Sequence, residues 1–259
     1  MPKSPRLIVF DLDGTALPAL EHRFFNHALI DVVARLQDQG THVTIATGRS
    51  LSSLLADPTI AALDLRDPLI IAGGALIVDP RNSAPLYATP LPHGVLDQLR
   101  PMLVELGIDT ALWDDYSEDD FVAGGLPLSD LPRDGHPYFL NFPKVSDIVT
   151  EEFLQRVSAL VGVQALVMNG LWPDAQEIHM LSHRATKYHA VRTLQQHFEI
   201  SPEETVGIGD GHNDMDLFDA VGHAVAVDNA VEPLRLRAHQ LIGHVNENGL
   251  AHYLNTLVH

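Results

Sequence analysis

Two aspartates separated by one residue follow a short apolar run near the start of the chain. Residues 7–10 read LIVF, and Asp11 and Asp13 come directly after them. An unbroken apolar run of this length is typical of a strand buried on both faces of a parallel sheet, and such sheets place ligand sites at the carboxyl ends of their strands. Two neighbouring carboxylates repel each other unless a cation lies between them or one is protonated. Because carboxylate oxygens suit hard cations, the pattern predicts a Mg2+ site.

A second acidic strand end lies near the other end of the chain. In the sequence VGIGDGHNDMDLF, residues 206–218, an apolar strand runs into Asp210, and Asn213 and Asp214 begin the helix that follows. The glycines around Asp210 allow the backbone to approach a ligand closely. A polar turn alone would explain one such strand end, since Asp and Gly are common turn residues. Two acidic strand ends in one α/β sheet indicate a functional site.

Two further groups could bind an anion. Thr47, Gly48 and Arg49 follow a predicted strand at residues 42–46, and a hydroxyl with free backbone N–H groups at a helix start is suited to phosphate. Thr47 could equally be only a helix cap, and Arg49 could contact phosphate or form a surface ion pair. Lys187 begins a predicted helix, where its charge opposes the helix dipole. This placement indicates a partner for Lys187, although a solvated surface lysine is the more common case.

Strands and helices alternate at both ends of the chain, which positions these residues. Short apolar runs predict the strands, and apolar residues at helical spacing predict the helices between them. The expected strands are 7–10, 42–46, 68–72, 205–208, 224–227 and 240–242, and the expected helices are 23–39, 51–55, 187–198, 213–220, 231–238 and 248–257. This alternation with short connections predicts an α/β fold with a doubly wound parallel sheet.

The middle of the chain has a different pattern. Residues 81–183 contain many prolines and glycine pairs, two helical stretches at 93–106 and 147–161, and short apolar runs such as 138–142 and 165–168. Pro101 lies inside the first helical stretch, where it is expected to kink or break the helix. The pattern predicts an inserted α+β domain at 81–183, with residues 1–80 and 184–259 forming the core.

Composition restricts the possible functions. The chain has 259 residues, 16 Lys and Arg against 34 Asp and Glu, and no cysteine. A net charge of −18 disfavours binding to nucleic acid or anionic lipid. Without cysteine there are no disulfides, thiolate metal sites or cysteine nucleophiles. No stretch has the pattern of a signal peptide or membrane span, so a cytoplasmic location is the default expectation.

The motifs together resemble those of a known superfamily. DLDGT, then T-G-R, then a lone lysine, then GDGHND are similar to the signature motifs of the haloacid dehalogenase (HAD) superfamily, in the same order. The later sequence AVDNAVEPLR and NENGLAHYL resembles its Cof-like phosphatases, which carry a large α+β cap. The resemblance covers residues 5–79 and 184–258. One departure is Gly73 in IAGGA, where that subfamily usually has Asn, and the stretch EIHMLSHRATK before the lysine is longer than usual.

The resemblance implies a role for each motif residue. Asp11 would be the nucleophile that forms an aspartyl-phosphate, and Asp13 would protonate the leaving oxygen and then activate water. The ligands implied for Mg2+ are Asp11, the backbone carbonyl of Asp13, Asp210 and Asp214. The groups implied for the phosphoryl oxygens are Thr47, Lys187, Asn213 and the backbone N–H groups of Leu12 and Gly48.

Spacing distinguishes between the cap types of the superfamily. Asp11 and Thr47 are 36 residues apart, which leaves no room for a small helical cap, whereas 140 residues separate Thr47 from Lys187. Asp13 also argues against a dehalogenase, which would lack this acid. We therefore expect a Mg2+-dependent phosphatase for a small phosphate monoester, a sugar phosphate first, with pyridoxal phosphate, nucleotides and phosphoglycolate behind. The alternatives are a phosphomutase of the same fold, or a noncatalytic regulator, which would be expected to lack Asp11 or Asp13.

The substrate itself has no motif in this sequence. In the architecture that the resemblance implies, the cap lines the site, so cap side chains would select the substrate. Candidates at or near turns between the predicted cap elements are Phe142, Lys144, Asn169 and Trp172. The oligomeric state leaves no signal in the sequence.

Overall fold

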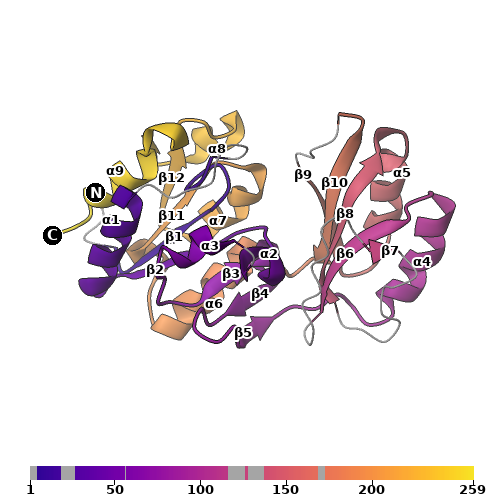
Figure 1. Ribbon diagram of the computed structural model, residues 1–259, viewed down its shortest axis with the longest axis horizontal. Helices are drawn as coiled ribbons and strands as arrows, with labels where there is room; N and C mark the ends of the chain where they lie inside the picture. The colour runs from indigo at the N-terminus through magenta and orange to yellow at the C-terminus, as the bar shows by residue number, and fades with distance from the viewer. Residues whose placement is uncertain (1–4, 19–26, 56, 116–125, 128–136, 169–172) are drawn as a thin grey trace. The chain divides into compact units, whose positions relative to one another are not determined.

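The computed structural model describes residues 5–18, 27–55, 57–115, 126–127, 137–168 and 173–259. The chain divides into two compact units (Figure 1). Unit 1 comprises Met1–Arg49, Leu54–Tyr87 and Thr186–His259, and unit 2 comprises Ser50–Ser53 and Ala88–Ala185. Across the described ranges, no helix is both long and apolar enough to cross a membrane.

Unit 1 is built on a parallel sheet whose central strand is β1, Leu7–Phe10. The strand order is β13-β12-β11-β1-β2, and every residue of β1 is paired in register on both sides. The other strands are β2 (His42–Ile45), β11 (Thr205–Gly209), β12 (His223–Val227) and β13 (Gln240–Ile242). The predicted strands are confirmed, and the complete burial of β1 explains its unbroken apolar sequence.

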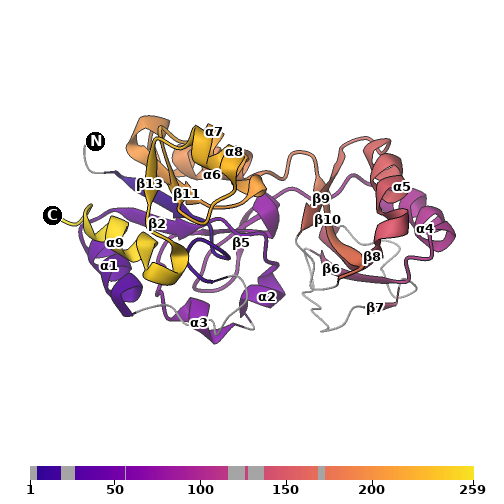
Figure 2. The ribbon, with the colours of Figure 1, turned by 90° about the horizontal axis from the view of Figure 1, so that it is seen from above.

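Helices cover both faces of this sheet, as a doubly wound fold requires. Leu7 and Val9 pack with apolar residues of α6, α7 and α8, while α1 and α9 lie on the opposite face (Figure 2). The helices of unit 1 are α1 (His27–Asp38), α3 (Pro58–Ala61), α6 (Lys187–Phe198), α7 (Met215–Ala220), α8 (Glu232–Arg237) and α9 (Gly249–Asn255). The short helix α2 (Leu51–Leu55) is divided between the two units. Residues 23–26 of the first predicted helix lie outside the described residues.

A small three-stranded sheet extends unit 1 beyond β2. Its strands are β3 (Leu69–Ile71), β4 (Leu76–Val78) and β5 (Pro85–Ala88), and a parallel bridge joins Ala46 to Ile70. The sequence predicted only the first of these strands. β4 continues the apolar sequence of β3 after two glycines, and the residues of β5 are exposed or half-buried, so neither strand has a distinct apolar pattern of its own.

Unit 2 is an antiparallel sheet with two helices on one face, α4 (Val95–Glu105) and α5 (Asp147–Ser158) (Figures 1 and 2). The strand order is β7-β6-β8-β10-β9. The strands are β6 (Thr110–Asp115), β7 (Leu126–Pro127), β8 (Pro137–Ser146), β9 (Val163–Met168) and β10 (Ala175–Ser182). The predicted α+β character of this region is confirmed.

Pro101 does not break the helix, since α4 continues through this residue. Proline removes only one backbone hydrogen bond. The apolar face of α4, which includes Leu96, Leu99 and Leu103, is buried in the core of unit 2 and holds the helix together.

Phe142 lies in that same core. Its side chain is fully buried and packs edge to face on Phe153 of α5, with ring centroids 5.2 Å apart. Leu140, Ile178 and Met180 lie in the same cluster. Phe142 therefore packs the sheet against the helices, a position that offers no surface to a ligand.

We expect Phe142→Ala to destabilise unit 2 by about 3–5 kcal/mol, because it leaves a cavity in a packed core. Urea unfolding followed by tryptophan fluorescence measures this, since Trp113 is buried in the core of unit 2. Val104→Ala is the matched control, because Val104 is 71% exposed on α4. Equal stability of the two variants, with an altered substrate preference for Phe142→Ala, would contradict the packing role.

Candidate active site

The loop after β1 brings the first acidic strand end against the second. The N–H of Asp11 donates to the carbonyl of Ile208 at 2.9 Å, and Thr15 Oγ1 donates to Asp210 Oδ1 at 2.6 Å. Gly14 has a φ of +90°, and a Cβ atom there would lie 2.3 Å from Asp210 Oδ2. The glycine of DLDGT is therefore required by backbone conformation and by the approach of the Asp210 carboxylate.

Lys187 is buried between two of the predicted site carboxylates. Its Nζ donates to Asp11 Oδ1 at 2.5 Å and to Asp214 Oδ1 at 2.7 Å, and the residue is 2% exposed. Thr186 caps α6 by accepting from the N–H of His189, which fixes the helix start that carries the lysine. The partner that the sequence indicated for Lys187 is a pair of carboxylates.

Burial dominates the electrostatics of this cluster. It raises the pKa of Asp11 well above its usual value, with Lys187 opposing the shift and Asp214 and Asp210 adding to it. Burial likewise raises the pKa of Asp210 to about 7, with the charge of Asp214 as the next cause. For Lys187, burial lowers the pKa, but the carboxylates of Asp11 and Asp214 outweigh it and the net shift is upward.

The carboxylates present a donor set that fits a hard divalent cation. Oxygen atoms of Asp11, Asp210 and Asp214 all lie within 4.8 Å of one another. Asp214 is more heavily engaged than the other two, because its Oδ2 accepts from the N–H groups of Asp210 and Gly211, both at 2.9 Å. Asp214 thus holds both Lys187 and the loop after β11.

The loop after β2 carries the predicted phosphate-binding hydroxyl. Thr47 is buried, its Oγ1 accepts from the N–H of Arg49 at 3.1 Å, and its carbonyl accepts from the N–H of Gly73 at 2.9 Å. Gly73 has a φ of +64°. Both Gly and Asn tolerate this conformation, which accounts for glycine where the Cof-like sequences usually have Asn.

The turn after β3 connects the Thr47 loop to the lysine helix. The N–H of Ala72 donates to the carbonyl of Arg49 at 2.7 Å, and a Cβ atom on Gly74 would lie 2.3 Å from the carbonyl oxygen of Thr186. The turn is therefore packed between the two segments that carry the predicted phosphate ligands Thr47 and Lys187.

Arg49 forms a mostly buried clamp on Asp13. Its Nε and Nη2 donate to the two carboxylate oxygens of Asp13 at 2.7 and 2.6 Å, and its Nη1 donates to Asp57 at 2.8 Å. The arginine side chain is 9% exposed. Of the two alternatives for Arg49, the structure shows the ion pair, and its bidentate geometry fixes the plane of the Asp13 carboxylate.

The remaining predicted residues have different surroundings. Leu12 is buried, while Gly48 and Asn213 are half-buried in the loops after β2 and β11. Lys144 is exposed on β8. The last two specificity candidates, Asn169 and Trp172, lie outside the described residues.

Asn229 holds the loop after β1 in place, and the sequence did not predict this role. Its Nδ2 donates to the carbonyl of Gly14 at 2.7 Å, and its Oδ1 accepts from the N–H of Val245 at 3.0 Å. The only signal is its place in the AVDNAVE segment after β12, where an amide side chain is an ordinary turn residue.

Comparison with known proteins decides the family. The model of the haloacid dehalogenase-like hydrolases matches residues 8–122 and 144–254. The chain belongs to this family. It is an enzyme, a phosphatase of the HAD superfamily, and its fold and its motifs are those of Cof-type members.

The similarity to relatives covers nearly the whole length of this HAD phosphatase. An HMP-PP phosphatase of Serratia proteamaculans is 28% identical and covers 96% of this chain and 94% of its own. The solved phosphatase BT1666 from Bacteroides thetaiotaomicron has a TM-score of 0.78 at 20% identity, covering 98% and 95%. A sugar phosphatase of HAD subclass IIB has a TM-score of 0.77 at 17% identity, covering 97% and 98%.

We expect Arg49→Lys to slow hydrolysis of alkyl phosphates by at least about tenfold while affecting p-nitrophenyl phosphate much less. Lysine keeps the charge but cannot hold both oxygens of Asp13, and a poor leaving group depends most on an acid held in place. The measurement is the ratio of kcat/KM for the two esters.

Arg66→Lys is the control for this ratio, since Arg66 forms an exposed ion pair with Asp38. An equal fall for both esters in Arg49→Lys would contradict a role in proton donation.

Proposed function

We propose that this phosphatase is Mg2+-dependent and hydrolyses a small phosphate monoester through an aspartyl-phosphate on Asp11. The observation that carries the proposal is the buried cluster in which Lys187 bridges Asp11 and Asp214 beside Asp210. Phosphoryl transfer needs little covalent machinery, but it needs neutralisation of charge on the phosphoryl oxygens. In a chain with a net charge of −18, this cluster gathers a buried lysine and a cation-binding donor set around one carboxylate.

In the first step, an Asp11 oxygen attacks phosphorus and the bond to the leaving oxygen breaks. Asp13 gives its proton to that oxygen, so that a neutral alcohol departs. In the second step, water attacks phosphorus while Asp13 takes a proton from it, and inorganic phosphate leaves with Asp11 restored. Arg49 bonds to both oxygens of the ionised Asp13 carboxylate and fixes its orientation for the second step, in which Asp13 accepts the proton.

The residues proposed to hold the cation are Asp11, the carbonyl of Asp13, Asp210 and Asp214, the last directly or through a water molecule. A bound Mg2+ would supply positive charge at the phosphoryl oxygens. Lys187 would supply the second positive charge. The groups proposed to bind the oxygens are Thr47, Asn213 and the N–H groups of Leu12 and Gly48.

A hydrolase is favoured over the alternatives. A regulator that had lost catalysis would be expected to lack Asp11 or Asp13, and both are present. A phosphomutase would depend on a bisphosphate activator, which an assay separates from hydrolysis. One relative is named an HMP-PP phosphatase, and one structural neighbour is named a sugar phosphatase. These names support a small phosphorylated metabolite as the substrate. We propose that residues 81–183 act as a cap that selects it.

Asp11→Asn should abolish turnover of every phosphate monoester, because it keeps the shape of the side chain but replaces the charged nucleophile with a neutral amide. The protein should still fold, because Asp214 remains as a carboxylate partner of Lys187. A panel of phosphate esters assayed with Mg2+, with circular dichroism as the check on folding, measures this. Asp31→Asn on α1 is the control, since Asp31 is exposed. Activity within tenfold of the unchanged protein in Asp11→Asn would contradict the nucleophile assignment.

Mg2+ should bind more tightly as the pH rises from about 5.5 to 7.5. Asp210 has a pKa of about 7 in the absence of a cation, so below that pH a proton must leave before the carboxylate can bind Mg2+. Loss of one proton gives a gain of about tenfold in affinity per pH unit, which levels off above the pKa. Titration calorimetry at several pH values measures it.

Asp210→Asn should remove most of this affinity and its pH dependence. A Mg2+ affinity that does not change across this pH range, or that survives in Asp210→Asn, would contradict the proposed ligand set.

A further inference from the structure

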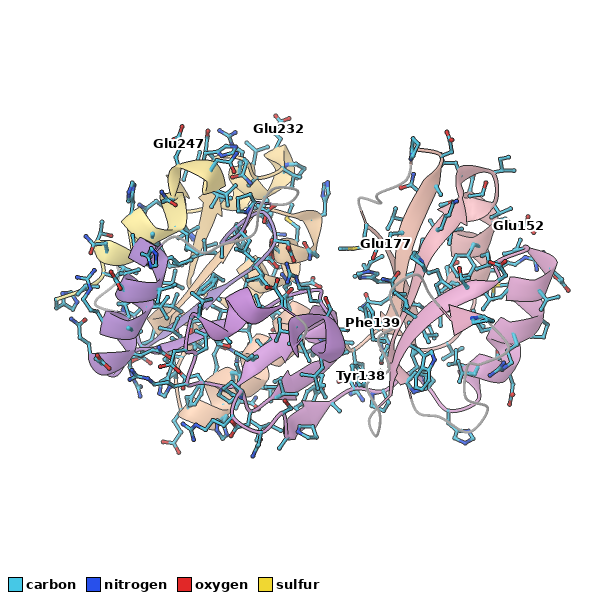
Figure 3. All side chains as sticks on the ribbon, in the orientation of Figure 1. Tyr138, Phe139, Glu152, Glu177, Glu232 and Glu247 are labelled. Atoms are coloured by element: carbon cyan, nitrogen blue, oxygen red, sulfur yellow. The ribbon has the colours of Figure 1, made fainter. Side chains whose placement is uncertain are left out.

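Three loops at the carboxyl edge of the unit 1 sheet meet at one amide side chain. Asn229 follows β12, and its Nδ2 donates to the carbonyl of Gly14, in the loop after β1, at 2.7 Å. Its Oδ1 accepts from the N–H of Val245, in the turn after β13, at 3.0 Å. Figure 3 shows Glu232, the first residue of α8, and Glu247, in that same turn, along one edge of unit 1. The side chain of Asn229 thus joins the loops after β1 and β13 to its own.

The bond from Asn229 to Gly14 crosses the end of a strand that carries a proposed cation ligand. In the order β13-β12-β11-β1-β2, strand β11 lies between β12 and β1. Asp210 comes directly after β11, and its backbone carbonyl accepts from the N–H of Val231 at 2.9 Å. Residues 229–231 therefore hold both acidic loops, one through Gly14 and the other through Asp210.

Gly14 is the position of greatest intrinsic freedom in the loop after β1. The approach of the Asp210 carboxylate leaves no room for a Cβ atom at this residue. Glycine has more backbone freedom than any other residue, so hydrogen bonds have to fix its conformation. Its N–H donates to the carbonyl of Leu17 at 2.6 Å, within the loop, and its carbonyl accepts from Asn229. The second of these bonds fixes the loop against the rest of unit 1.

The two peptide groups at Gly14 orient groups of the proposed cation site. A trans peptide directs its C=O and N–H in opposite directions, so the bond made by the Gly14 N–H also sets the direction of the Asp13 carbonyl. The next peptide leads to Thr15, whose Oγ1 donates to Asp210 Oδ1 at 2.6 Å. Asn229 binds the carbonyl of this second peptide. It therefore limits the movement of the Asp13 carbonyl on one side and of the Thr15 hydroxyl on the other.

We propose that Asn229 is a positioning residue for the cation site, which keeps the Asp13 carbonyl and the Asp210 carboxylate arranged for Mg2+ before the ion binds. This rests on the proposed function, since it names a residue that supports the proposed ligands. Groups that orient metal ligands strengthen binding, because the ion does not have to order those ligands itself. A tether that only stabilises the fold predicts a lower melting temperature with an unchanged Mg2+ affinity.

The first test measures Mg2+ binding to the full chain by titration calorimetry, without substrate. Asn229→Leu removes both hydrogen bonds at similar side-chain size, and it should weaken Mg2+ binding by about 10- to 100-fold. At saturating Mg2+ the ion orders the loop, so kcat for p-nitrophenyl phosphate should return to within about threefold of the unchanged protein. An unchanged Mg2+ affinity, at a temperature at which thermal melts show the variant to be folded, would overturn the proposal.

A second variant separates positioning from charge. Asn229→Asp keeps the shape of the side chain and an acceptor for the N–H of Val245, but it places a carboxylate oxygen against the Gly14 carbonyl. By charge alone, an added carboxylate near the site would strengthen Mg2+ binding, whereas the loss of positioning weakens it. We expect binding weaker by about tenfold or more. A gain in affinity would contradict the positioning role.

Gln37→Glu is the matched control for this change. Gln37 also joins two backbone groups, since its Nε2 donates to the carbonyl of Asp64 at 3.2 Å and its Oε1 accepts from the N–H of Arg66 at 2.8 Å. It lies near the end of α1, before β2, and so at the opposite edge of the sheet from the site. Its Mg2+ affinity should equal that of the unchanged protein.

Hydrogen exchange separates this inference from the proposed function, because it requires neither turnover nor a cation. Without Mg2+, Asn229→Leu should speed exchange in a peptide covering residues 11–17 by about tenfold, and Gln37→Glu should not. Faster exchange together with weaker Mg2+ binding supports the positioning role even if the protein hydrolyses no ester. Unchanged exchange overturns this role and leaves the proposed function standing, whereas an unchanged protein that binds no Mg2+ overturns both.

Discussion

A lysine ammonium removed from water between two carboxylates is the interaction on which this molecule depends most. Lys187 bonds to Asp11, which is 176 residues away in the sequence, and to Asp214. Removing one partner of a buried ion pair costs about 3–5 kcal/mol, since it leaves a charge without compensation. Strands β1 and β11 and the start of α6 must therefore come together for the core to be stable, and the residues that stabilise the fold are those proposed to act on phosphate.

Close backbone approaches around the cluster follow from this constraint. Gly14 lies against the Asp210 carboxylate, Gly209 lies against the Asp214 side chain, and Gly74 lies against the carbonyl of Thr186. A Cβ atom at any of the three would come within 2.5 Å of its neighbour. The charged side chains can be this close together only because the backbone beside them carries no side chain of its own.

The strands and helices of unit 1 could be predicted from the sequence because the signals there are local. Buried strands appear in the sequence as apolar runs, and the unfavourable position of Lys187 at a helix start indicated a partner. The Arg49 clamp on Asp13 depends on residues 36 positions apart, and no local pattern distinguished it from a surface ion pair. In unit 2, β10 was missed because Glu177 and His179 interrupt its apolar residues, so that the segment resembles a polar loop. Phe142 was taken for a ligand contact because the burial of a side chain is decided by tertiary packing, which the sequence does not show.

The central claim is that Asp11 carries the phosphoryl group, and acid-quench mass spectrometry tests it most directly. Asp13→Asn slows the attack of water on the intermediate, so the protein mixed with p-nitrophenyl phosphate and Mg2+ and quenched in acid should accumulate the covalent species. The account predicts a peptide spanning residues 6–15 that is heavier by one phosphoryl group, with the modification on Asp11 and absent from Asp11→Asn. A phosphoryl group on another residue, or burst release of p-nitrophenol with no modified peptide, would contradict it.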